Sequence, residues 1–251
     1  MLSVEGLSFS YGERDVLRGV DFSIERGLNC LLGPNGSGKS TLMKCIAGIL
    51  RPREGKILVN GNDVTGLSQR EISKLIAYSS QEFPKAFPYT VFEMVLMGRN
   101  PHIDPLEGPK EEDEKAAFEA LKRLGLEDLA ERPFTELSGG EKRLVMIARS
   151  IAQGGEVLLF DEPTSFLDFR NQHTVLSVIS SLAEDRPVLV SLHDPNLALM
   201  FSQRAFLMKN GRIIGGGRAE EVITPENLSL LYEVPIEKRS VPLMVPKGVF
   251  P

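Results

Sequence analysis

The 251-residue chain has little cysteine, with Cys30 and Cys45 as its only two. They form no C-x-x-C pair and lie in apolar stretches with no histidine nearby in the sequence. We therefore expect two buried free thiols, not a disulfide or a metal site. The N-terminus lacks the pattern of a secretory signal, and together with the scarcity of cysteine this predicts a cytoplasmic protein.

Long apolar runs and an excess of basic residues are also missing. No apolar run approaches the roughly 20 residues that cross a bilayer, so we expect any membrane role to be peripheral or through a partner. The chain has 29 Lys and Arg against 34 Asp and Glu, a net charge of −5, which argues against a nucleic-acid surface. With 42% hydrophobic and 25% charged residues, the composition is that of a globular protein.

The periodicity of the apolar residues predicts an α/β protein. The stretches "LSVEGLSFSYG" and "VLRGVDFSIERG" alternate as antiparallel strands do, and they lead into a buried strand, "LNCLLG". A helix follows "GPNGSG", and we expect Pro52 to end it. Its predicted apolar face consists of Leu42, Met43, Ile46, Ala47 and Leu50. Later strand-like runs alternate with helical stretches, which predicts a parallel sheet. From Thr224 onward the sequence predicts no element.

The stretch "GPNGSGKST" matches the pattern G-x-x-x-x-G-K-[ST] between a predicted strand and a predicted helix. Its glycines let backbone N–H groups approach a phosphate closely. Lys39 can then reach the β- and γ-phosphates of a nucleotide, and the Ser40 hydroxyl can ligate Mg²⁺. We call this segment the phosphate loop; it consists of Gly33, Pro34, Asn35, Gly36, Ser37, Gly38, Lys39, Ser40 and Thr41. The alternative is a glycine-rich turn with a solvated lysine.

Two carboxylates end the apolar run "EVLLF", namely Asp161 and Glu162. In a phosphate-loop protein, an aspartate at the end of a neighbouring strand orders the Mg²⁺ shell. Glu162 is then placed to polarise an attacking water as a general base. Without the phosphate loop in the same chain, an ordinary polar strand end would be the better interpretation.

The LSGGE segment, residues 137–141, predicts a second helix start. Ser138 and Glu141 have the spacing of a capping box. The predicted buried stripe of this helix is Leu144, Val145, Ile147, Ala148 and Ile151. The box does not require Gly139 and Gly140, and a glycine weakens a helix by about 1 kcal/mol relative to alanine. We interpret the two glycines as bare backbone open to a ligand or a second chain, because helix N-termini attract anions.

The phosphate loop, the LSGGE segment and the strand that ends in Asp-Glu, in this order, resemble the nucleotide-binding subunit of an ABC transporter. The resemblance extends over about residues 2–220. It implies that two copies pair head to tail, with each ATP between the phosphate loop of one copy and the LSGGE segment of the other. It also implies that the Ser138 hydroxyl and the N–H of Gly140, beside Gly139, meet the γ-phosphate of the partner's ATP.

The resemblance also implies a domain organisation. The fold would be a P-loop NTPase (RecA-like) α/β core with an N-terminal antiparallel β subdomain and an inserted α-helical subdomain. We expect one ABC ATP-binding domain over residues 1–251. Within it, residues 1–86 and 153–251 would form the core, and residues 87–152 the helical subdomain with the LSGGE segment.

Four further positions match residues with roles in the family. Tyr11 resembles the aromatic residue that stacks on adenine. Gln81 resembles the glutamine that reaches Mg²⁺ and the attacking water and links the core to the helical insertion. Asp168, in "SFLD", belongs to a loop that communicates across the dimer, and His193 matches the histidine that contacts the γ-phosphate and helps hold the water. The implied cofactors are ATP and Mg²⁺.

One phosphate loop per chain implies a separate ATPase subunit that works as a homodimer. The stretch "TVFEMVLMGRNPH" resembles importers of iron–siderophores, haem, cobalamin and related metal chelates. That resemblance implies a peripheral place at the cytoplasmic face of the membrane, integral-membrane permease partners, and indirectly a solute-binding protein. A helix of the permease would dock in a groove near Phe83, Phe87, Tyr89 and Val91.

Three alternatives remain open. One is a soluble ABC-type protein that acts on nucleic acid or ribosomes, although such proteins carry two cassettes or long coiled-coil arms, and this chain has neither. Another is a P-loop kinase or transferase, which would leave the LSGGE segment and His193 without a role. The third is an importer ATPase for another class of solute.

Overall fold

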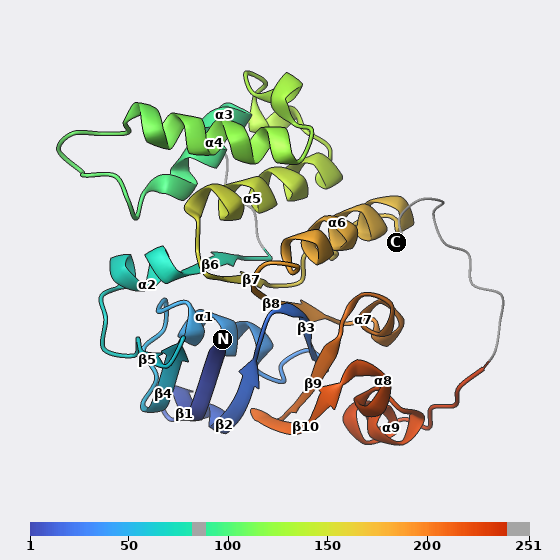
Figure 1. The fold of residues 1–251 in the computed structure, drawn as a ribbon. Coiled ribbons are helices and arrows are strands. Elements are labelled where there is room, and N and C mark those ends of the chain that lie inside the picture. Colours follow the sequence, from blue (N-terminus) through green and yellow to red (C-terminus); the bar gives the residue numbers. More distant parts are fainter. Residues whose placement is uncertain (82–88, 240–251) are drawn as a thin grey trace.

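A computed structural model describes residues 1–81 and 89–239 (Figure 1). The N-terminal part forms a four-stranded antiparallel sheet in the order β2-β1-β4-β5. Its strands are β1 (Leu2–Tyr11), β2 (Arg14–Ile24), β4 (Glu54–Val59) and β5 (Asn62–Asp63). The predicted antiparallel pairing of the first two strands is confirmed.

A six-stranded sheet forms the centre of the molecule, in the order β10-β9-β3-β8-β7-β6. Its strands are β3 (Gly27–Leu32), β6 (Ile76–Ser79), β7 (Val157–Phe160), β8 (Pro187–Leu192), β9 (Arg204–Lys209) and β10 (Arg212–Arg218). All pairs are parallel except β9 with β10. Leu32 pairs with Leu192, and Ser79 pairs with Phe160, so neighbouring strands end at one edge of the sheet.

Both faces of the five parallel strands are buried, as is usual for a parallel sheet, whereas the edge strand β10 is partly exposed along its length. One apolar cluster lies between the two sheets and encloses α1 (Lys39–Ile46). A second cluster lies under helices on the opposite face. These helices are α6 (Phe169–Leu182), α7 (Pro195–Phe201), α8 (Ala219–Val222) and α9 (Pro225–Tyr232). Within β3, Leu31 belongs to the first cluster and Leu32 to the second, which matches the two-residue period of a strand.

Three helices at the top of Figure 1 have an apolar cluster of their own. They are α3 (Val91–Leu96), α4 (Glu111–Arg123) and α5 (Gly139–Gln153), with the short 3₁₀ turns η1 (Met97–Arg99), η2 (Glu127–Leu129) and η3 (Phe134–Glu136). Helix α2 (Gln69–Leu75) leads into β6. No helix in the described residues is long and apolar enough to cross a membrane.

One local prediction differs from the structure. Helix α1 ends at Ile46 and not near Pro52, because Gly48 adopts a left-handed φ of +71° and the chain turns. A Cβ on Gly48 would lie 2.5 Å from Ile72 Cδ1, so tertiary packing also favours glycine there. In the tail, where the sequence indicated no particular element, α9 forms after its N-cap Thr224 and buries Leu228 and Leu231.

The predicted state of the two cysteines is confirmed. Cys30 and Cys45 are buried and free. Burial raises the thiol pKa to about 12 for both residues.

A thiol-labelling experiment tests this burial. Because the thiolate is the reactive form, only about one thiol in ten thousand would be ionised at pH 8. A disulfide reagent should therefore modify neither Cys30 nor Cys45 in the native protein at pH 8, and both in urea. An added Ser181→Cys thiol, at an exposed position, should react at once as the matched control. Rapid native labelling of either natural cysteine would contradict the packing.

Candidate active site

A cavity of about 420 Å³ lies at the end of β3 beside the start of α1. It brings together Tyr11, Glu162 and most of the phosphate loop, which are far apart in the sequence. The complete lining is Tyr11, Arg14, Val16, Asn35, Gly36, Gly38, Lys39, Ser40, Thr41 and Glu162. Arg14 and Val16 were not predicted, because their place in the lining follows from the hairpin between β1 and β2.

The phosphate loop places a helix start at this cavity. Gly38 is the N-cap of α1, with a φ of +110° and no capping side chain, so the first turn presents its backbone N–H groups as an anion site. Gly33 has a second role beside the one its motif suggests. A Cβ on Gly33 would lie 2.2 Å from the Met208 carbonyl oxygen, so this glycine permits close packing on β9.

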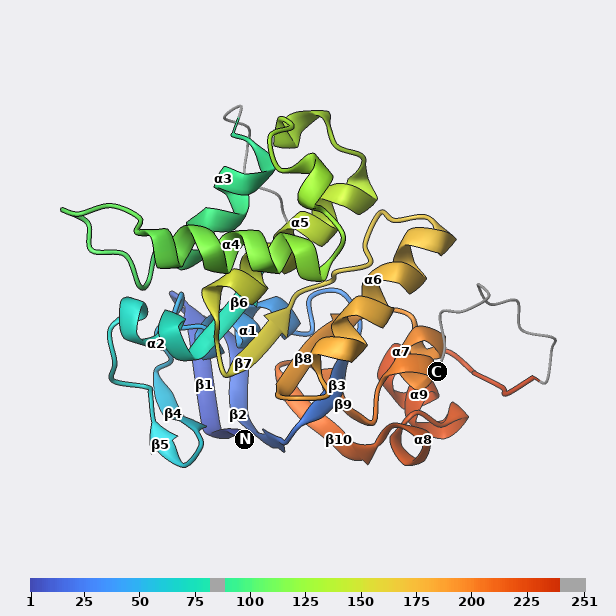
Figure 2. The ribbon, with the colours of Figure 1, turned by 45° about the horizontal axis from the view of Figure 1, so that its top comes forward.

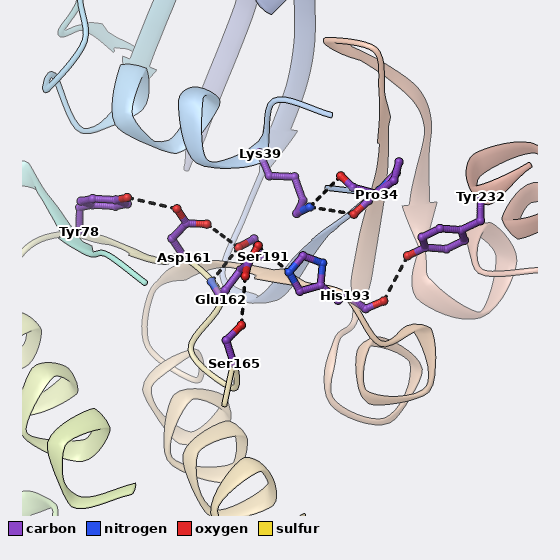
Figure 3. A network of polar contacts seen from close by, with 10 residues as sticks. Pro34, Lys39, Tyr78, Asp161, Glu162, Ser165, Ser191, His193 and Tyr232 are labelled. Atoms are coloured by element: carbon purple, nitrogen blue, oxygen red, sulfur yellow. Dashed lines mark hydrogen bonds and ion pairs between the residues drawn. The ribbon is translucent and has the colours of Figure 1, made fainter. Parts of the chain in front are cut away.

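Lys39 is buried and is already oriented along the loop. Its Nζ donates to the Gly33 carbonyl at 2.7 Å and to the Pro34 carbonyl at 3.2 Å (Figure 3). Burial lowers the pKa of Lys39, and the charges of Glu162 and Asp161 partly oppose that shift. The ammonium group is therefore costly to keep charged unless an anion lies nearby.

Asp161 is almost fully buried, and both of its carboxylate oxygens are bonded. Oδ1 accepts from Ser191 Oγ at 2.7 Å, and Oδ2 accepts from Tyr78 Oη at 3.2 Å (Figure 3). Ser191 Oγ in turn accepts from the Glu162 backbone N–H at 2.8 Å. Burial, and then the charge of Asp161, raise the pKa of the Tyr78 phenol. Ser191 and Tyr78 were missed, and their only sequence signal is a polar residue within an otherwise apolar strand.

Glu162 adopts a left-handed backbone with a φ of +49°, which is uncommon for a non-glycine residue. Its Oε1 lies 2.6 Å from His193 Nε2, and its Oε2 accepts from Ser165 Oγ at 3.0 Å. Tyr232 of α9 donates to the His193 carbonyl at 3.2 Å (Figure 3). The Glu162 carboxylate is thus held beside the His193 imidazole, at the edge where the parallel strands end. There it can accept a proton from water.

The LSGGE segment begins α5, and its capping box is confirmed. Ser138 Oγ accepts from the Glu141 N–H, and Glu141 Oε2 accepts from the Ser138 N–H and Oγ. Gly140 has a further role within the chain, beside the one predicted from the sequence. A Cβ there would lie 2.7 Å from the side chain of Asn171 on α6, so close helix packing explains Gly140 within the chain. At Gly139 the nearest such atom is 3.8 Å away.

Asp168, Gln81 and the LSGGE segment are absent from the lining of the cavity over the described residues. Asp168 is the N-cap of α6, where its Oδ1 accepts from the Asn171 N–H at 2.8 Å. The Gln81 carbonyl accepts from Arg143 Nη2 at 3.1 Å. Ser138, Gly139 and Gly140 also lie outside the lining.

The oxygen donors near the cavity suit a magnesium ion, which favours oxygen and usually keeps waters and substrate phosphates as ligands. The Ser40 hydroxyl lines the cavity, and Asp161 follows the neighbouring strand β7. Within the described part of the chain, no group of three or more His, Cys, Asp or Glu residues could hold a metal on its own. A metal at this site would therefore share its shell with a nucleotide.

The predicted docking groove is only partly described. Phe83 and Phe87 lie outside the described residues. Tyr89 is 38% exposed, whereas Val91 is fully buried in the helical cluster, so its prediction as a docking residue was wrong. A groove of about 230 Å³ does lie between the core and the helices. Its lining is Ala47, Ile49, Gln69, Ser73, Ile76, Tyr78, Met97, Gly98, Asn100, Pro101, Arg149 and Gln153.

Comparison with known sequences gives a consistent result. Residues 17–165 match the family model described as ABC transporter. The chain is 42% identical to an ABC transporter ATP-binding protein of Methanocaldococcus jannaschii, over 99% of this chain and 98% of that protein. It is 37% identical to the iron(3+)-hydroxamate import ATP-binding protein FhuC of Bacillus subtilis, and 38% identical to the molybdate import ATP-binding protein MolC of Haemophilus influenzae. Each of these two matches covers 94% of this chain and 89% of the relative.

Solved structures agree with the fold. A metal-chelate type ABC transporter in an inward-facing conformation has a chain 37% identical to this one, with a TM-score of 0.82 and coverage of 93% of this chain and 89% of that chain. A bacterial ABC transporter cassette solved as a dimer is 28% identical, with a TM-score of 0.74 and coverage of 87% and 99%.

Ser191 offers a test of the buried network. Replacing Ser191 by alanine leaves the Glu162 N–H and one Asp161 oxygen without this partner. We expect the free energy of unfolding to fall by about 1–3 kcal/mol. Urea denaturation measures the change, and Ser181→Ala at an exposed position of α6 is the matched control, expected within about 0.5 kcal/mol of the parent. Equal stability of the two variants would show that the hydroxyl does not hold the two carboxylate residues together.

Proposed function

The chain belongs to the ABC transporter family and is an ATP-hydrolysing subunit, and we propose that it drives an importer as a head-to-tail homodimer around two ATP molecules. The observation that carries this proposal is the separation of two anion-binding helix starts. One begins α1 at the cavity, and the other begins α5 outside the described lining. Two copies paired head to tail would bring the second helix start of one chain to the cavity of the other.

Symmetry supports this pairing. In a two-fold dimer, a contact from patch A to patch B of the partner is repeated from B to A. Two half-sites then form two complete sites and leave neither half exposed. The dimeric structure of a related cassette is consistent with the proposal.

We propose the following roles within each site. Tyr11 stacks on the adenine, and the loop from Gly33 to Thr41 with Lys39 holds the phosphates. Glu162 accepts a proton from the water that attacks the γ-phosphorus, so that ADP leaves and phosphate is released. His193 and Gln81 orient that water.

The partner chain would contribute Ser138, Gly139 and Gly140 to the γ-phosphate, with Asp168 at the interface between the two copies. Ser40, Asp161 and Gln81 would hold Mg²⁺ with the nucleotide. When bound, the ion would neutralise charge on the phosphates. Its donor set is made of oxygens, as Mg²⁺ prefers.

We propose that the chain is one ATP-binding domain over residues 1–251, with residues 87–152 as its helical subdomain. The separate apolar cluster of α3, α4 and α5 supports that division. An integral-membrane permease would dock on the groove between this subdomain and the core, where the exposed Ile49 lies. The protein would then lie at the cytoplasmic face of the membrane, with a solute-binding protein as an indirect partner and no nucleic acid.

Metal chelates are the solute class we propose, and the FhuC relative and the metal-chelate transporter support it. The second candidate solute is a metal-containing anion, because one of the relatives is a molybdate import protein. The exposed surface of this subunit does not select the solute under either proposal, because the permease carries that task.

Glu162→Gln tests the homodimer and the general base together. The amide keeps the size of the carboxylate but does not accept a proton, so we expect ATP hydrolysis to fall by about 100-fold or more. With ATP and Mg²⁺ the variant should elute from size-exclusion chromatography as a dimer, because bound ATP is no longer consumed.

Two controls accompany this measurement. Glu184→Gln changes an exposed carboxylate at the end of α6 and should leave turnover unchanged. Glu162→Gln with Lys39→Ala should stay monomeric, because the phosphates lose their cation. A Glu162→Gln protein that binds ATP tightly yet remains a monomer would refute the proposed assembly.

A further inference from the structure

Arg143 is a buried cation in the second turn of α5, and the roles proposed above do not include it. Arg143 is only 2% exposed. Nη1 donates to the Ser80 carbonyl at 3.2 Å, and Nη2 donates to the Gln81 carbonyl at 3.1 Å. Burial lowers the pKa of Arg143, and the charge of Asp161 opposes that shift. A guanidinium that is costly to bury is thus bonded to two consecutive peptide groups.

The two hydrogen bonds from the planar guanidinium restrain those peptide groups more than a single bond would. Two parallel N–H groups of one rigid plane contact adjacent carbonyls, so rotation of either peptide breaks a bond. Ser80 and Gln81 directly follow β6, and the carbonyl of Ser79 accepts from the Asp161 N–H at 2.9 Å. The segment that leads to the Gln81 side chain is therefore fixed from the strand on one side and from α5 on the other.

The same helix carries the LSGGE segment at its first turn. Arg143 lies three residues after Gly140, about one helical turn away. Figure 1 and Figure 2 show α5 beside β6 at the edge of the six-stranded sheet. Because a capped helix moves as one rigid element, a shift of Ser138 and Gly140 moves the guanidinium, and with it the Gln81 backbone.

We propose that Arg143 is a positioning residue that ties the Gln81 backbone to the helix start offered to the partner's ATP. This inference rests on the proposed head-to-tail function. Through Arg143, contact of the partner's γ-phosphate with Ser138 and Gly140 would set the position of Gln81 in the chain's own site. Occupation of one site would then raise the rate of hydrolysis in the other, by about the factor that Arg143→Met is expected to cost.

A double-mutant cycle tests the proposal by steady-state ATP hydrolysis. Arg143→Met should lower kcat by about 10- to 100-fold, because small displacements of positioning groups cost that much, while the Kd of the monomer for ATP stays within about 2-fold. In a Gln81→Ala background, Arg143→Met should change kcat by less than about 2-fold, since it acts through Gln81. Losses that multiply in the double variant, or a kcat near the parent value in the single one, would overturn the proposal.

Two further variants separate positioning from folding. Lys122→Met removes an exposed cation from α4, which packs beside α5, and it should leave kcat within about 2-fold of the parent. Arg143→Lys keeps the positive charge but loses the planar pair of N–H donors. Its kcat should therefore lie close to that of Arg143→Met. If Arg143→Met does not fold, the cycle is made with Arg143→Lys and the same outcomes apply.

A dimerisation measurement distinguishes failure of this inference from failure of the proposed function. Glu162→Gln with Arg143→Met should still form the ATP-bound dimer by size-exclusion chromatography. If this double variant dimerises, but the losses of kcat from Arg143→Met and Gln81→Ala multiply when the two are combined, only the positioning role is refuted. Absence of the dimer from Glu162→Gln itself would refute the assembly on which the role depends.

Discussion

The parallel register of β3, β8, β7 and β6 is the constraint on which the site depends. These neighbouring strands end at one edge of the sheet, so the segments that follow them meet there. The phosphate loop follows β3, His193 follows β8, Asp161 and Glu162 follow β7, and Ser80 and Gln81 follow β6. A hydroxyl inside β8, that of Ser191, then joins the two carboxylate residues across adjacent strands.

The start of α5 is the part of the chain that would connect this edge of the sheet to a partner copy. Its N-terminal turn is closed by a capping box and packed on α6 through Gly140 and Asn171. The loop before α6 returns to the first site, where Ser165 bonds to Glu162. On the other side, Arg143 bonds to the segment of Gln81. The helix that would serve the partner's nucleotide is thus attached at two points to the groups around its own.

Local motifs were predicted well from the sequence because their chemistry lies within a few residues. The phosphate loop, the capping box of Ser138 and the buried thiols are of this kind. Ser191, Tyr78 and Tyr232 were missed, because their partners depend on strand register or on a helix far along the chain. The packing of Gly140 was missed for the same reason, since Asn171 lies in another helix. The end of α1 depends on the packing of Gly48 against Ile72, which a periodic pattern does not contain.

The central claim is that one active site is built from two chains, and mixing two inactive variants tests it most directly. In a mixed dimer of Glu162→Gln and Ser138→Arg, one site carries both changes and the other carries neither. Tags on the two variants establish that mixed dimers form, and hydrolysis is measured in a single turnover as the mixing ratio varies. The account predicts that activity reappears and is greatest near equal amounts, below the parent rate because Ser138→Arg also interrupts the contact that Arg143 would pass to Gln81. Mixed dimers that form but stay inactive at every ratio would show that Ser138 serves the nucleotide of its own chain.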